Sequence, residues 1–256
     1  MSFRNGFLLI IILITSSFQN IAAQADKNLY VEYEVSFNLG ITIQKEAILI
    51  SNGTSSIFKT LNNQNREKIT RSEDGNYNIV AKGETEVIYT DLSYNTNFII
   101  SSLENKKYKI IDNFQPLKWD LQLDKSKLIN GVKVFNATTN FRGRKYSAWY
   151  NPAIPVPTGP WKFSGLPGLI IEISDTTNKF QWAAKTIKYP YNLNENISIP
   201  DSADFKEISY RKFIELKTNL RTDMEKREMA RAPQGTTLLS SKTTRGVELE
   251  YEWEKE

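Results

Sequence analysis

The residues Leu29-Tyr-Val-Glu-Tyr-Glu-Val-Ser-Phe37 alternate between apolar and polar side chains with a period of two. That period puts the apolar side chains on one face of an extended strand and Glu32 and Glu34 on the other, which is typical of a strand with one buried face. Gly40 then marks a turn, and residues 41–50 resume a β-branched, apolar pattern. The stretch therefore predicts two neighbouring strands of an antiparallel sheet.

Further short strands are predicted along the chain, separated by turn residues. They cover residues 77–81, 85–90, 97–103, 107–111, 133–138, 145–150, 169–173 and 179–187. Strands and turns that follow one another this regularly favour an antiparallel sheet over alternating strand and helix units. We therefore expect a mainly β fold, in which one curved antiparallel sheet or half-barrel has a single C-terminal helix packed on it.

The helix is predicted at about residues 203–230, where Asp201 or Ser202 can cap its first turn. Its apolar residues recur at spacings of three to five and are Phe205, Ile208, Phe213, Leu216, Leu220 and Met224. A helix with one apolar stripe needs a surface to pack on. We expect that surface to be the inner face of the curved sheet.

The last segment, residues 247–254, alternates apolar residues with glutamates. This pattern predicts a C-terminal strand at the edge of the sheet. Its glutamates would point outward and discourage pairing with other chains.

The first residues have the pattern of a secretory signal, with Arg4 followed by an unbroken apolar run from Phe7 to Ile14. The run is shorter than the roughly 18 to 20 residues of a membrane-spanning helix. We expect a cleaved signal at residues 1–23, although a cut after Ala25 fits as well, and a single β-rich domain over residues 24–256. Because the chain has no cysteine to carry a lipid at the cut, we expect an exported protein, periplasmic or secreted, that is neither a lipoprotein nor membrane-spanning.

The composition restricts the chemistry that the chain can perform. Without histidine or cysteine it cannot use Ser-His-Asp or Cys-His machinery or ordinary zinc ligands, so we lean toward a protein that is not an enzyme and expect no cofactor and no metal. A hydrolase with two carboxylates is the less favoured alternative, with Glu172 and Asp175 as the pair. The simpler interpretation is that Glu172 points to solvent and Asp175 starts a turn.

The charges are nearly balanced, with a net charge of +4. Basic residues do not form a stripe, so we expect no nucleic acid partner. Arg142, Arg144 and Lys145 form one small group, which we interpret as a solvated hairpin tip.

Residues 152–160 are rich in proline, which removes backbone donors and prevents a central strand. We expect a polyproline-like strip across the sheet. The aromatic residues beside it are Trp149, Tyr150, Trp161 and Phe163. They are the candidate binding residues, because flat rings can stack on a ligand, although packing around the proline rings explains them as well.

A second motif follows the proline strip and consists of Gly165, Leu166, Pro167, Gly168, Leu169 and Ile170. Proline and glycine at its third and fourth positions predict a type II turn, since glycine adopts the positive φ that this turn requires. We assign the motif a structural role.

These residues resemble the GLPGLI family, whose name is the hexapeptide that Gly165 to Ile170 spells. The lead-in is similar to the family as well, with Trp149-Tyr150, Ile154-Pro155 and Gly159-Pro160. The resemblance implies an exported protein of Gram-negative bacteria. It implies no activity and no catalytic residues, because none is assigned to the family.

We therefore expect a non-enzymatic exported envelope protein with a binding or accessory role, whose partner is an outer-membrane or other envelope protein. The alternative is a carrier that holds a lipid or another apolar ligand in the concavity of the sheet. The inner surface discriminates between the two, because a carrier needs an apolar cavity there.

Overall fold

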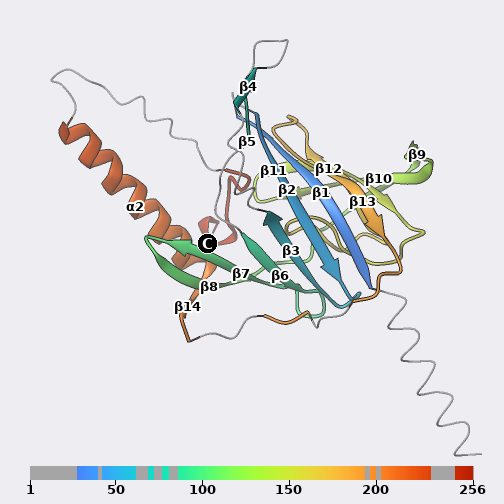
Figure 1. Ribbon diagram of the computed structural model, residues 1–256, viewed down its shortest axis with the longest axis horizontal. Helices are drawn as coiled ribbons and strands as arrows, with labels where there is room; N and C mark the ends of the chain where they lie inside the picture. Colours follow the sequence, from blue (N-terminus) through green and yellow to red (C-terminus); the bar gives the residue numbers. More distant parts are fainter. Residues whose placement is uncertain are drawn as a thin grey trace, which may run out of the picture.

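The computed structural model describes residues 28–39, 42–61, 69–71, 77–80, 86–193, 197–199, 203–231 and 246–255 (Figure 1). The expected signal at residues 1–23 lies outside these ranges.

The first two strands are β1 (Leu29–Asn38) and β2 (Thr42–Ser51), and they form the antiparallel pair that the sequence predicts. Leu29 lies opposite Ser51, and Asn38 lies opposite Thr42. Every second residue of β1 is buried from Leu29 to Val35, as expected for a strand with one face in the core.

The other strands continue this sheet. They are β3 (Ser55–Leu61), β4 (Ile69–Arg71), β5 (Tyr77–Val80), β6 (Val87–Asp91), β7 (Thr96–Leu103), β8 (Lys106–Asn113), β9 (Asp120–Ile129), β10 (Val132–Phe141), β11 (Arg144–Asn151), β12 (Leu169–Asp175), β13 (Phe180–Lys188) and β14 (Phe205–Ser209). The order along the sheet is β14-β8-β7-β6-β3-β2-β1-β13-β12-β11-β10-β9, and β4 and β5 attach beside β2.

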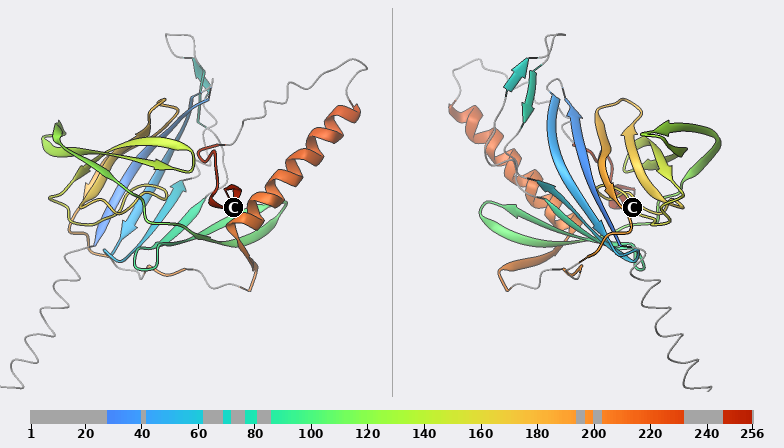
Figure 2. Two further views of the ribbon diagram at one scale, coloured as in Figure 1. Left: turned by 180° about the vertical axis from the view of Figure 1, so that it is seen from behind. Right: turned by 45° about the vertical axis from the view of Figure 1, so that its right-hand side comes forward.

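The sheet is curved and open, with β14 and β9 at its two ends (Figures 1 and 2). Two pairs of described strands, β14 with β8 and β2 with β5, are parallel, and the other pairs are antiparallel. The prediction of a mainly β fold with one curved, largely antiparallel sheet is therefore confirmed.

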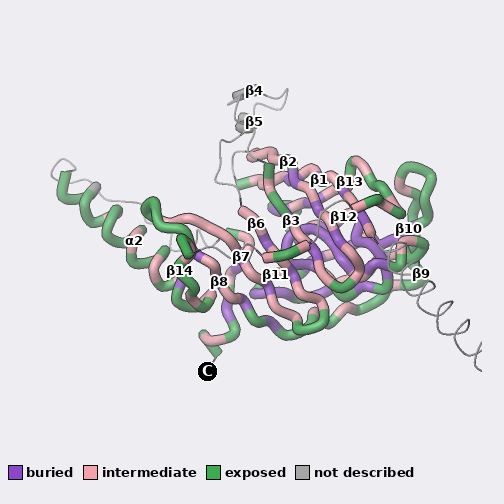
Figure 3. The backbone as a smooth tube through the Cα atoms, turned by 60° about the horizontal axis from the view of Figure 1, so that its bottom comes forward, coloured by how far each residue is buried: buried purple, intermediate pink, exposed green. Residues whose placement is uncertain are grey.

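The core lies in the half of the sheet around β1 and β10 to β13 (Figure 3). Aromatic rings fill it. The rings of Trp161 and Trp182 are stacked at 5.8 Å, and the Phe163 ring lies edge-on to Tyr146 at 4.7 Å. The hydroxyl of Tyr33 on β1 donates a hydrogen bond of 2.6 Å to the Ile170 carbonyl on β12, so a buried polar atom is satisfied across the intervening strand β13.

Residues 152–168, which we call the motif loop, connect β11 to β12 and make no strand of their own, as the prolines predict. The expected type II turn is wrong. The Gly168 amide donates to the Leu166 carbonyl two residues back, and the Leu169 amide donates to Ile154 instead of closing the turn. Glycine is still required at position 168, because φ is +149° and an added Cβ would lie 2.2 Å from the Asn151 carbonyl oxygen.

Helix α2 (Tyr210–Arg231) begins later than the expected residue 203. Phe205 and Ile208 belong to β14 instead, which pairs with the open edge of β8. The helix packs on the sheet through its first turns, where the Phe213 ring lies 5.8 Å from Tyr108. Its far half projects away from the sheet, and Met224 is 53% exposed (Figure 1). The residues expected to cap it, 201 and 202, lie outside the described residues.

Residues 246–255, which we call the tail segment, do not form the expected edge strand. They bend at Val247, make no strand ladder and end in the short 3-10 helix η1 (Glu252–Glu254). Glu248, expected to point outward, is buried. The reason is that cationic side chains from distant parts of the sequence surround it.

Candidate functional site

The four aromatic residues singled out as candidate binding residues do not form one exposed face. Tyr150, Trp161 and Phe163 are buried in the core. Trp149 is half-buried, and the Lys127 ammonium lies 4.5 Å from the centre of its ring. Three of the four rings therefore pack the inside of the protein and offer no open surface to a ligand.

The two carboxylates considered for a hydrolase, Glu172 and Asp175, are engaged separately. They lie three residues apart on β12, so they point to opposite faces of the sheet. Glu172 forms a surface ion pair of 2.5 Å with Lys127. Asp175 is buried, accepts a hydrogen bond from the Phe180 amide and lies 3.5 Å from the Arg144 guanidinium. This arrangement does not provide an acid and a base on one substrate.

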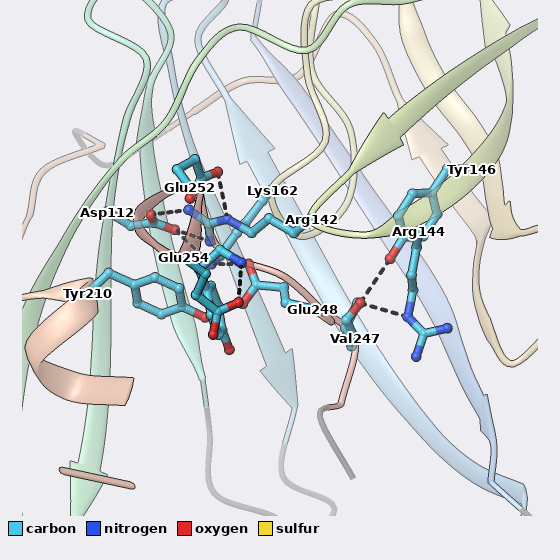
Figure 4. A network of polar contacts seen from close by, with 11 residues as sticks. Asp112, Arg142, Arg144, Tyr146, Lys162, Tyr210, Val247, Glu248, Glu252 and Glu254 are labelled. Atoms are coloured by element: carbon cyan, nitrogen blue, oxygen red, sulfur yellow. Dashed lines mark hydrogen bonds and ion pairs between the residues drawn. The ribbon is translucent and has the colours of Figure 1, made fainter. Parts of the chain in front are cut away.

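The most unusual site in the described residues is a buried charge cluster of Asp112, Arg142, Lys162 and Glu248 (Figure 4). Each member comes from a different part of the fold. Asp112 lies on β8, Arg142 at the turn between β10 and β11, Lys162 in the motif loop and Glu248 in the tail segment. The cluster therefore connects four parts of the chain that are far apart in sequence.

Arg142 and Lys162 each bridge both carboxylates. The Arg142 guanidinium binds Asp112 with two nitrogens, at 2.6 and 3.0 Å, and lies 2.5 Å from Glu248 Oε1. The Lys162 ammonium lies 2.7 Å from Asp112 and 2.9 Å from Glu248. Two cations thus balance two anions, which is the condition under which buried charges are tolerated.

Two further groups complete the cluster. The Tyr210 hydroxyl, at the start of α2, donates a hydrogen bond to the second oxygen of Glu248. Glu252, which is 45% exposed, accepts a hydrogen bond of 3.1 Å from Arg142 Nε. Both glutamates that contact Arg142 belong to the tail segment, so this segment is held to the cluster at two points.

The cations of the cluster favour the ionised form of Asp112. Burial alone would raise the pKa of Asp112, but the charge of Lys162 and the ion pair with Arg142 outweigh it and hold the pKa below its ordinary value of 3.8. Burial and the negative charge of Glu248 raise the pKa of Tyr210 well above its ordinary value, so its hydroxyl stays a donor. Asp112 lies between two cations that stabilise its ionised form, so it is not suited to deliver a proton to a substrate.

Sequence reasoning missed this cluster. It placed Arg142 at a solvated hairpin tip, but the Arg142 side chain is only 2% exposed. It placed Glu248 on an outward face because the alternation of residues 247–254 gave that direction. Only the pairing of chain segments far apart in sequence could reveal that these charges meet.

A second feature is an apolar cavity of about 350 Å³ beside the turn between β9 and β10. Its lining is mostly aliphatic and consists of Ile129, Asn130, Val132, Val134, Asn151, Ile154, Ile171, Ala184, Lys185, Ile187 and Tyr189. Val132 and Ile187 of this lining are 43% and 38% exposed. The cavity therefore opens to solvent through an apolar rim.

A larger hollow lies elsewhere, between α2 and the tail segment, with a volume of about 710 Å³. Its walls carry Arg211, Lys217 and Arg221 beside Ile214 and Trp253, so its lining is more highly charged than that of the cavity beside the β9–β10 turn.

Two statements, on membrane-spanning helices and on metal-binding groups, hold for the part of the chain that the structure describes. No helix there is long and apolar enough to cross a membrane. No three acidic side chains there come together in a way that could hold a metal ion.

A family described as "Protein of unknown function (Porph_ging)" matches residues 45–172, which is half of the chain and includes the motif loop. The chain belongs to this family. A comparison of the chain with curated proteins found no match.

Among solved structures, two crystal forms of PNGF-II are similar to this chain, with TM-scores of 0.50 and 0.52 at 16% and 17% identity. They cover 74% and 73% of this chain, which spans 32% of the length of PNGF-II. At this identity the likeness concerns the fold alone.

Two other solved structures are more distant. An uncharacterised conserved protein from Thermus thermophilus has a TM-score of 0.39 at 8% identity and covers 75% of this chain and 99% of its own. A LolA superfamily protein from Nitrosomonas europaea has a TM-score of 0.28 at 11% identity and covers 68% and 94%. Scores this low do not establish a shared fold.

Proposed function

We propose that this protein is an exported, non-enzymatic envelope protein that binds an aliphatic group of a ligand in the cavity beside the β9–β10 turn. The observation that carries this function is the cavity itself, which is lined mainly by aliphatic side chains and open through Val132 and Ile187. Ligand cavities of proteins measure roughly 300 to 1,000 Å³, so a cavity of about 350 Å³ suits one acyl chain better than a whole lipid.

The rest of the inner surface of the sheet also favours a small site at the β9–β10 turn over a large lipid site in the concavity. The motif loop covers the core half of the sheet with Val156, Trp161, Phe163 and Leu166, all of them buried. The tail segment and the charge cluster occupy the space between β8 and the β10–β11 turn. A carrier that encloses a large lipid in the concavity would need to displace these elements, whereas the cavity at the β9–β10 turn needs no displacement.

Export and membership in the GLPGLI family belong to the proposal as well. The signal-like residues 1–23 support export, and the hexapeptide from Gly165 to Ile170 supports the family. In this proposal the hexapeptide has a structural role, because Gly168 allows the motif loop to fold against the backbone of β11.

Binding can be tested with a fluorescent fatty acid, 11-dansylamino-undecanoate, added to the purified chain. We expect saturable binding with a blue shift of the dansyl emission, because an apolar cavity removes the dye from water. Ala184→Phe should weaken binding roughly tenfold or more, because the larger side chain occupies space in the cavity that the ligand would otherwise fill. Ala183→Phe is the matched control, because its side chain points to the other face of β13 and does not line the cavity.

Equal binding by the two folded variants would contradict the proposed site, and the absence of saturable binding would contradict the function. Native mass spectrometry of the chain purified from a Gram-negative envelope without detergent provides an independent measurement. A reproducible extra mass that Ala184→Phe removes would identify the natural ligand.

A further inference from the structure

The tail segment lies on the β10–β11 turn in the manner of a bound peptide. Arg144 donates a hydrogen bond of 2.9 Å to the Val247 carbonyl (Figure 4). It donates another, of 3.0 Å, to the Gly246 carbonyl. The Arg142 carbonyl accepts hydrogen bonds from the amides of Leu249 and Glu250, at 2.8 and 3.2 Å. These contacts go to the main chain of the tail segment and do not depend on its side chains.

The turn leaves room for this peptide at Gly143. The residue has a φ of +81°, and an added Cβ would lie 2.9 Å from the Leu249 Cβ and 3.0 Å from the Glu250 Cγ. A side chain at this position would therefore collide with the tail segment. The turn of Arg142, Gly143 and Arg144 thus combines a bare surface for the peptide backbone with an arginine on either side.

One side chain of the tail segment enters a deep, polar site. Glu248 receives hydrogen bonds from Arg142, Lys162 and Tyr210. Without its carboxylate, Lys162 and Arg142 would share the buried Asp112, and the only other carboxylate named in the cluster is the half-exposed Glu252, so the buried positive charge would be poorly balanced. The site is therefore specific for a negatively charged side chain long enough to reach both cations.

We propose that the β10–β11 turn is a receptor for an acidic peptide that places a glutamate between two aliphatic residues, and that the tail segment is the ligand bound in cis. Val247-Glu248-Leu249 supplies this sequence within the chain. A peptide of the same chemistry, presented in trans by another polypeptide, fits the same contacts. This site is separate from the apolar cavity and does not depend on the function proposed for it.

The test uses the full chain with Glu248→Gln, which weakens the cis contact while keeping the shape of the side chain. The probe is a fluorescein-labelled peptide of residues 246–255, and its binding is followed by fluorescence anisotropy. The control peptide carries glutamine at position 248. The control chain carries Glu250→Gln, which removes an exposed acid paired with Lys255 and leaves the site occupied.

We expect the Glu248→Gln chain to bind the glutamate peptide roughly tenfold or more tightly than the glutamine peptide, because hydrogen bonds to a charged group are lost in the latter. The wild-type and Glu250→Gln chains should bind the glutamate peptide at least about tenfold more weakly than the Glu248→Gln chain, since their sites are filled.

Equal affinity for the two peptides, or no binding by a folded Glu248→Gln chain, would overturn the proposal. Circular dichroism reports whether the variant is folded. If Glu248→Gln is not folded, Glu248→Asp replaces it in the same anisotropy titration. Its side chain keeps the negative charge but is shorter by one methylene. If neither variant folds, the tail segment is an integral part of the core and not an exchangeable ligand, which also overturns the proposal.

Discussion

Replacing Lys162 with methionine tests how much the buried charge cluster contributes to stability. Methionine retains the length of the lysine stem and removes its charge. The Lys162 side chain is only 1% exposed and contacts Asp112 at 2.7 Å and Glu248 at 2.9 Å. In the variant, two buried carboxylates share a single cation, Arg142.

Removal of one partner from a buried ion pair costs roughly 3 to 5 kcal/mol, because the remaining charge is desolvated without compensation. The total free energy of unfolding of a domain is about 5 to 15 kcal/mol, so Lys162→Met should remove a large share of it. At about 2 to 4 °C per kcal/mol for a chain of this size, the melting temperature should fall by roughly 6 to 20 °C.

Urea unfolding followed by tryptophan fluorescence measures this loss. Lys127→Met is the matched control, because the ion pair of Lys127 with Glu172 is exposed and its loss should cost less than about 1 kcal/mol. The double variant Asp112→Asn with Lys162→Met restores the charge balance, with Arg142 opposite Glu248. Its cost should be smaller than the sum of the single variants by about 2 kcal/mol or more. Additivity within about 0.5 kcal/mol would refute the reasoning, because it would mean that Asp112 and Lys162 do not interact.

Two further predictions concern the motif loop and acid stability. Gly168→Ala should lower the free energy of unfolding in urea by about 3 kcal/mol or more, because its Cβ would lie 2.2 Å from a backbone oxygen. The control Gly246→Ala, whose Cβ would have nothing within 4 Å, should change it by less than about 0.5 kcal/mol. Similar losses for both variants would disprove the close approach at Gly168. Because the pKa of Asp112 is lowered on folding, its stabilisation is fully present above its ordinary value of 3.8 and is lost as the pH falls below it. In Asp112→Asn, the urea concentration at the unfolding midpoint should therefore decrease less steeply as the pH falls below about 3.8. An unchanged dependence on pH would show that other carboxylates control the loss of stability in acid.

The strands could be predicted from the sequence because alternation with a period of two is a local property. From Leu29 to Phe37 apolar residues recur at every second position, and burial in β1 follows this pattern. The predicted start of the helix was wrong for a physical reason. Phe205 and Ile208 are three residues apart, which fits a helix, but the open edge of β8 offers backbone partners that the local pattern does not show.

The charge cluster could not be predicted because burial of a charge depends on partners. Glu248 alternates with Val247 and Leu249 and so resembles an outward residue of an edge strand. Its actual direction is decided by Arg142 and Lys162, which lie 106 and 86 residues away in the sequence. No local pattern contains that information.

The position of Glu248 in the sequence also has a consequence for the order in which the protein can fold. Glu248 follows Asp112, Arg142 and Lys162 in the sequence and belongs to a separate segment of the chain. Until the tail segment has docked, the two cations have one carboxylate between them, and their burial is unfavourable. The contact between β8 and the β10–β11 turn is therefore completed only after the tail segment has joined it.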